Sequence, residues 1–338
     1  MKIKKKNIDH IINSQTENAA AFDLYRAAKG LQLIRYASDN TIPRAEDATS
    51  TILLGQAMYV FETLTNAFST PANAIIRCAL MSTKDWFPIL IREPALDTIT
   101  VCPILIDTVE CLTRREIPIV RLSIPNGRII VDRYAGLCTT LLPLLYDLCT
   151  LSYDRKVDNH SATTAAATES PDTDYLTNIE QSIQSWKPTL PPNFFTDYTK
   201  EETLLMTTQS EVYRLAALLI IHRLRYPLGI NDEPAIDLAK AIFSQLYTFA
   251  FSMTISMPQK KQPALGALPV VFPLMLAMLE IEGPGETILS MLSSFTVQTI
   301  CASRMTGFIN EVRAARQAGF DGLWFDLVDS KLHVSVIP

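Results

Sequence analysis

The stretch from Ser210 to Gly229 constrains the fold more than any other part of the chain. It runs Ser-Glu-Val-Tyr-Arg-Leu-Ala-Ala-Leu-Leu-Ile-Ile-His-Arg-Leu-Arg-Tyr-Pro-Leu-Gly. Apolar residues fall on nearly every face of a helix built from this stretch, and such a helix lies inside a helical body rather than on its surface. Pro227 and Gly229 close it. We therefore expect an all-α fold packed around this segment.

The composition supports a packed helical chain. Hydrophobic residues make up 48% of the 338 residues and charged residues 19%, which argues against global disorder. The presence of only 11 glycines favours helices over glycine-punctuated sheets. The 30 Lys+Arg and 35 Asp+Glu give a net charge of −5. No general basic field is thus available for a phosphate backbone, which argues against generic nucleic-acid binding.

Helical spacing, prolines and capping residues predict about ten to twelve helices. The expected ranges are 16–37, 48–68, 71–81, 97–115, 131–153, 200–226, 232–255, 265–282, 284–308, 310–318 and 323–332. The helix over 131–153 should be interrupted or kinked near Pro143.

The segment 119–131 is the one ambiguous piece. Apolar, β-branched runs flank Asn126-Gly127. On local rules this pattern predicts at most one small β-hairpin around an Asn-Gly turn.

The sequence divides into four parts. Residues 1–15 form a basic, disordered head, 16–153 a first helical half, 154–173 a polar, low-complexity flexible linker, and 174–338 a second helical half of the same domain. The lysines of the head are a nuclear-localisation patch, a weak DNA arm or a solvated terminus. No apolar run follows them to make a signal peptide. The most hydrophobic run, 265–279, is too short and proline-rich to span a membrane. We expect no membrane contact.

The six cysteines suit buried free thiols in a reducing compartment. They are Cys78, Cys102, Cys111, Cys138, Cys149 and Cys301. The gaps between them are 24, 9, 27, 11 and 152 residues, so no Cys-x-x-Cys pair is present. Structural zinc sites need closer spacing.

Motifs for catalysis are lacking. No His-Glu-x-x-His pair, Gly-x-Ser-x-Gly elbow, phosphate loop or dinucleotide fingerprint occurs. His222 suits a core or helix-end histidine better than a catalytic base. An all-helical terpene cyclase would need two acidic clusters to hold magnesium, and Asp321, Asp326 and Asp329 are the nearest approach to one. We assign no catalytic, metal-binding or DNA-binding residue and no cofactor.

Aromatic and methionine side chains recur in two of the expected helices. They are candidates for lining an apolar ligand pocket, and the bland alternative is ordinary core packing. The candidate pocket residues are Phe249, Met253, Phe272, Met275 and Met278.

Several blocks, in order, resemble the regulatory domain of fungal zinc-cluster transcription factors, the fungal-specific transcription factor domain. The strongest is Glu211 to Leu224; the others are 53–68, 72–79, 107–122, 136–146, 268–280 and 323–326. The resemblance covers most of 45–330. It implies an all-α regulatory module, with a loop rather than a hairpin between the helices around 119–131. In this family the module follows a zinc cluster of six closely spaced cysteines, which these 338 residues lack.

The resemblance implies a nuclear fungal transcriptional regulator without its own DNA-reading head. Such a chain would act through a protein partner, either a DNA-binding regulator or a second copy; control by a small apolar ligand is the further possibility that the resemblance leaves open. Genes of secondary-metabolite clusters are the expected context. The alternatives are a stand-alone, cytoplasmic sensor of an apolar ligand and, third, an all-helical enzyme.

Overall fold

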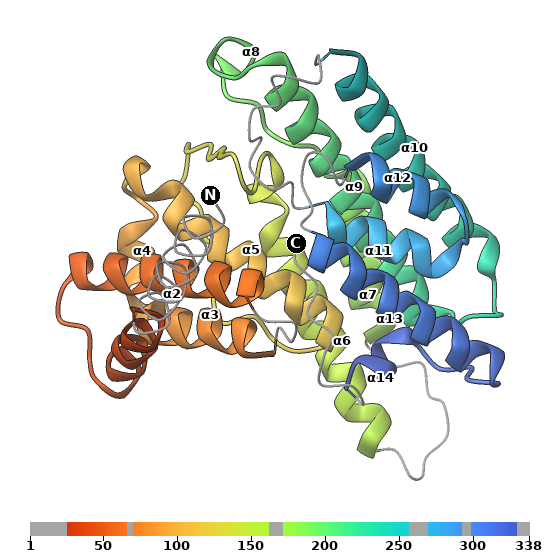
Figure 1. Ribbon diagram of the computed structural model, residues 1–338, viewed down its shortest axis with the longest axis horizontal. Helices are drawn as coiled ribbons and strands as arrows, with labels where there is room; N and C mark the ends of the chain where they lie inside the picture. The colour runs from red at the N-terminus through yellow and green to blue at the C-terminus, as the bar shows by residue number, and fades with distance from the viewer. Residues whose placement is uncertain (1–25, 66–69, 162–171, 257–269, 293–298, 330–338) are drawn as a thin grey trace, which may run out of the picture.

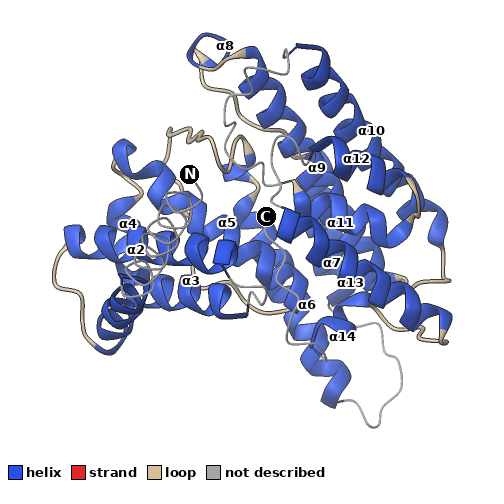
Figure 2. Cartoon of the chain, viewed as in Figure 1, coloured by secondary structure: helices blue, strands red, loops and turns tan. Residues whose placement is uncertain are grey.

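The computed structural model describes residues 26–65, 70–161, 172–256, 270–292 and 299–329. Within these ranges the structure has 13 α-helices joined by turns and loops, and no strand (Figure 2). The all-α prediction is confirmed. The basic head 1–15 and its lysines lie outside the described residues.

The helices follow the labels of Figure 1. Their bounds are α2 Ala45–Thr65, α3 Thr70–Thr83, α4 Phe87–Leu90, α5 Asp97–Arg114, α6 Leu142–Ser161, α7 Asp172–Ser185, α8 Phe194–Asp197, α9 Lys200–Arg225, α10 Asp232–Ser256, α11 Val271–Glu280, α12 Pro284–Leu292, α13 Thr299–Gln317 and α14 Trp324–Asp329. Residues 26–39 are also helical.

The helices form two groups around one main apolar core. In the first, α2 pairs with α3 and both contact α5. In the second, α9, α10 and α11 pack together, with α12 and α13 outside them (Figure 1). Helices α6 and α7 connect the groups, because α6 contacts both α5 and α9 and α7 contacts both α6 and α9. Buried residues of both groups belong to the same contiguous core.

Helix α9 is the central element, as its sequence predicts. Thr199 and Glu202 form a capping box at its start, which satisfies two backbone N–H groups that have no partner inside the helix. By length and composition α9 could cross a membrane, but 78% of its apolar window is buried inside the protein. Its apolar surface is therefore used in packing against neighbouring helices.

Of the two alternatives for 119–131, the loop implied by the family resemblance is confirmed, and the small hairpin around Asn126-Gly127 does not form. Residues 116–131 contain no strand; a turn forms at Asn126-Gly127, where the Arg128 N–H donates to the Pro125 carbonyl at 3.1 Å. The two flanking runs bond to helices instead of to each other. Ile119 N–H donates to Asp107 Oδ2 on α5 at 2.7 Å. Contacts made outside the segment thus override its local preference.

Helix α6 differs from its predicted range at both ends. It starts at Leu142, so Pro143 stands in its first turn, where a proline lacks no hydrogen bond, and no kink is needed. The preceding residues form turns and a short 3₁₀ helix, Cys138–Thr140. The helix then runs to Ser161, eight residues into the predicted linker 154–173. Residues 162–171 lie outside the described chain.

Helix α14 packs across the first group of helices. It contacts α5, and its Trp324 and Phe325 are buried in the main core. The Arg115 guanidinium lies 3.4 Å from Asp326 Oδ1, a contact between residues 211 positions apart. The end of the described chain is thereby tied to the end of α5.

Candidate functional site

The five predicted pocket residues are all buried in the main apolar core. Phe249 and Met253 on α10 and Phe272, Met275 and Met278 on α11 are at most 1% exposed, and all belong to the main core. Helices α10 and α11 pack directly against each other. All five thus belong to the same core cluster, but they do not all face one another: Phe272 packs near Tyr213 of α9, and Met278 lies beside Gly285 of α12. Whether this cluster opens for a ligand stays a prediction.

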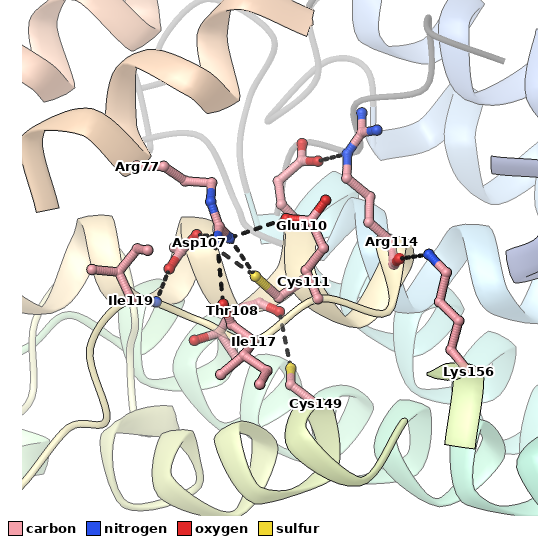
Figure 3. Close-up of polar contacts among 11 residues, drawn as sticks. Arg77, Asp107, Thr108, Glu110, Cys111, Arg114, Ile117, Ile119, Cys149 and Lys156 are labelled. Atoms are coloured by element: carbon pink, nitrogen blue, oxygen red, sulfur yellow. Dashed lines mark hydrogen bonds and ion pairs between the residues drawn. The ribbon is translucent and has the colours of Figure 1, made fainter. Parts of the chain in front are cut away.

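A buried carboxylate on α5 organises the first polar centre (Figure 3). Asp107 is fully buried and accepts from Arg77 Nη1 at 2.9 Å and from the Ile119 N–H at 2.7 Å. Burial raises the pKa of Asp107, and the charge of Arg77 and the Ile119 N–H oppose that rise. Arg77 also reaches the Ile117 carbonyl at 3.2 Å. Asp107 and Arg77 together hold the chain as it leaves α5.

The same centre contains two thiols. Cys111 Sγ accepts from Arg77 Nη1 at 2.8 Å, and Cys149 Sγ donates to the Thr108 carbonyl at 3.6 Å (Figure 3). Burial raises the pKa of both thiols, so both stay protonated and unreactive at neutral pH. The five cysteines whose side chains the structure describes, which are Cys78, Cys102, Cys111, Cys138 and Cys149, are free, as predicted.

The C-terminal end of α5 carries further charges. The carboxylate of Glu110 is buried and lies 3.3 Å from Arg114 Nε. Lys156 of α6 donates to the Arg114 carbonyl at 3.1 Å, where a cation complements the helix dipole. Arg115 has a left-handed backbone, with φ of 55°, and its Nε donates to the Ser152 carbonyl at 3.1 Å. These contacts fix the direction in which the chain departs toward residues 116–131.

A second polar centre lies at the C-terminal end of α9. Arg223 is 2% exposed and binds Glu280 of α11 with two nitrogens, Nε to Oε1 at 3.1 Å and Nη2 to Oε2 at 2.5 Å. Its Nη1 donates to Asp232 Oδ1 at 2.7 Å, at the start of α10. The guanidinium therefore ties three helices together. Burial lowers the pKa of Arg223, and its bonds to the two carboxylates outweigh that effect, so the pKa is raised.

Helix α13 completes this centre. Arg313 Nη2 donates to the Met278 carbonyl at 3.2 Å, and Arg316 Nη1 donates to the Leu279 carbonyl at 2.5 Å. Both carbonyls are in the last turn of α11, where cations are favourable. Glu280 thus faces a concentration of positive charge.

The residues weighed for catalysis take structural positions. His222 is half-buried at the end of α9, with Nε2 2.8 Å from the Asn231 carbonyl. This is the helix-end histidine that the sequence suggests. Asp326 pairs with Arg115. Over the described ranges, no three His, Cys, Asp or Glu side chains gather to hold a metal ion, so the magnesium site of a cyclase has no support there.

Two surface hollows lie elsewhere. One, of about 580 Å³, lies between residues 84–92 and the segment 119–125. The other, of about 550 Å³, lies among α7, α9 and α10, beside His222. Neither is lined by the five predicted pocket residues. Sequence reasoning missed the first hollow and both polar centres. The available signal was a charged residue inside an apolar helical run, such as Asp107.

Comparison with protein families identifies the family of this chain. The family model of the fungal specific transcription factor domain matches residues 80–318, from α3 to the end of α13. The chain belongs to this family. No zinc-cluster family model was found in the chain. Searches of curated proteins and of solved structures gave no significant match. Members of this family are in general not enzymes, in keeping with the positions of His222 and Asp326.

Proposed function

We propose that this chain is the regulatory body of a fungal transcriptional regulator and reaches promoters through a protein partner. The observation that carries the proposal is the family match over 80–318, which covers most of the helices that share one core. The partner is a DNA-binding regulator or a second copy. The net charge of −5 argues against a general basic field that would hold DNA. The nucleus is the proposed location, and secondary-metabolite genes are the first targets to examine.

Chromatin immunoprecipitation in the native fungus tests the proposal. The chain carries an epitope tag at its own locus, and an untagged strain is the control. Enrichment at a defined set of promoters is expected. In parallel, the purified chain should not shift those promoter fragments in a gel unless a partner is added. A chain that stays in the cytoplasm and is absent from chromatin would contradict the proposal.

A second candidate function is a stand-alone sensor of a small apolar ligand. The burial of Phe249, Met253, Phe272, Met275 and Met278 on two helices that contact each other favours it, because methionines pack adaptably around apolar molecules. Mass spectrometry of organic extracts from the purified chain is the direct test. A stoichiometric apolar compound in a protein that stays in the cytoplasm would support the sensor over the regulator.

A further inference from the structure

The connection after α5 contains a row of backbone groups that have no hydrogen-bond partner among the described residues. Residues 120–125 are neither helical nor turned. No hydrogen bond from any described residue reaches the N–H or C=O groups of 120–124. Leu122 is 3% exposed, whereas Arg121 and Ser123 on either side of it are exposed, which is the alternation of a strand. We call residues 119–124 the open edge.

Two prolines enclose the open edge. Pro118 precedes it and Pro125 follows it. Each proline lacks an N–H and biases the residue before it toward extended conformations. The prolines therefore keep the edge extended and limit its length. At its beginning, the bond from the Ile119 N–H to Asp107 anchors the edge to α5.

The open edge lines the hollow of about 580 Å³. The opposite wall consists of residues 84–92, with Phe87 and Ile91 forming an apolar floor. This volume falls within the range of about 300–1,000 Å³ that is typical of ligand sites. Unpaired backbone groups beside an apolar floor are the features that a protein uses to add a peptide strand to its own edge.

The charges around the hollow define the peptide. Lys84, Arg92 and Arg121 line it, with Asp85 as the single acid. Arg121 pairs with Asp147, whereas no ion pair to a described residue engages Lys84 or Arg92. Both of these cations are exposed. Positive charge around an apolar floor complements a segment that carries carboxylates beside apolar side chains.

We propose that the open edge binds an extended segment of a partner protein, in which apolar side chains alternate with acidic ones. The segment pairs its backbone with residues 120–124, places an apolar side chain over Phe87 and Ile91, and directs carboxylates to Lys84 and Arg92. This inference rests on the proposed function, because it assigns a surface to the protein partner. It identifies how one partner is held, not which one.

A phage-displayed library of random octapeptides, screened against the full chain, is the probe. Enriched peptides should alternate apolar and acidic residues, and their affinities are measured by fluorescence anisotropy. Ser123→Pro removes one backbone donor and should weaken binding about fivefold, the equivalent of one hydrogen bond. Ser123→Ala keeps the N–H and should bind as the natural chain does.

Charge reversal gives an independent variant in case the proline disturbs folding. Arg92→Glu should weaken binding about tenfold, because repulsion replaces attraction. Lys187→Glu reverses an exposed charge away from the hollow and should leave binding unchanged. Circular dichroism verifies that each variant is folded.

Three results would overturn the proposal. One is a library that enriches nothing. Another is enriched peptides whose binding neither Ser123→Pro nor Arg92→Glu alters. The third is a concentration-dependent dimer in sedimentation that Ser123→Pro abolishes, which would assign the edge to a second copy. Promoter occupancy by the natural chain is measured separately. Occupancy without peptide binding refutes only this inference, whereas absence from chromatin refutes the proposed function.

Discussion

Asp107 and Arg223 are both buried charges in central helices, but they hold different kinds of structure. Asp107 binds a side chain and the backbone N–H of a non-helical segment, Ile119. Arg223 binds two carboxylates at the ends of other helices, Glu280 and Asp232. The first centre holds the non-helical segment 116–131 in place. The second centre joins three helices, α9, α10 and α11, to one another.

The two centres also differ in their access to water. Arg77, the partner of Asp107, is 24% exposed, so its charge can be hydrated if the carboxylate is lost. Arg223 and Glu280 are each 2% exposed. Removing one partner of a fully buried pair leaves a charge that water cannot reach, and this is the costly case. The pair of Arg223 and Glu280 should therefore contribute more to the free energy of unfolding than the pair of Arg77 and Asp107.

Glu280→Ala should have the largest effect. It leaves Arg223 buried beside Arg316 with only Asp232 as a carboxylate partner, and about 3–5 kcal/mol of the free energy of unfolding should be lost. Urea unfolding followed by circular dichroism measures it. Arg44→Ala, which breaks an exposed pair with Asp47, is the matched control and should leave the free energy of unfolding nearly unchanged. Equal losses in the two variants would refute the ranking.

Asp107→Ala should cost less, about 2–3 kcal/mol, because Arg77 can turn toward solvent while the Ile119 N–H loses its acceptor. Its distinguishing effect is local. Hydrogen exchange at Ile119 should accelerate more than exchange within α9. A uniform acceleration through the whole chain would show that Asp107 does not act on the connecting segment in particular.

Gly136→Ala probes the point where the connecting segment meets α9. Gly136 has φ of +55°, and an added Cβ would come within 2.4 Å of Gln209 Oε1. We expect a loss of about 1–3 kcal/mol in the free energy of unfolding, from backbone strain and the displaced amide. Gly127→Ala is the control, since it shares a positive φ but meets no atom within 4 Å. Similar losses in both variants would leave strain alone as the cause.

Glu202→Gln should have the smallest effect, and one that depends on pH. The backbone N–H of Thr199 lowers the pKa of Glu202, with burial opposing and the contact with Arg133 reinforcing the shift. A carboxyl whose folded pKa is lowered stabilises the fold above its unfolded pKa, near 4.5, and loses this contribution as pH falls through the folded value. The natural chain should be about 0.5 kcal/mol more stable than the variant at pH 6. That advantage should disappear toward pH 3, and a constant difference would contradict the assignment.

The sequence predicted helices best where capping residues and prolines bound them. Helix α5 was expected over 97–115 and observed over 97–114, and α9 was expected over 200–226 and observed over 200–225. Helix α7 was not predicted, because only three apolar residues form its buried face and the rest of the stretch is polar. These residues are Leu176, Ile179 and Ile183.

The contents of the polar centres could not be predicted, because their partners are distant in sequence. Arg223 and Glu280 are 57 positions apart, and Arg77 and Asp107 are 30 apart. The residues next to Asp107 in the sequence do not indicate which segment of the chain its carboxylate will bind. The same reason explains the false hairpin, since the anchor at Ile119 comes from α5 rather than from the segment itself.

The contact between Arg115 and Asp326 has a consequence for biosynthesis. Its two residues are 211 positions apart. At about 5–20 residues per second, a ribosome needs roughly 10–40 s to add the second after the first. During that interval the core around α5 lacks Trp324 and Phe325, and the nascent chain exposes the apolar surface that they cover. The apolar surface at α5 can therefore be covered by these two rings only after α14 has left the ribosome.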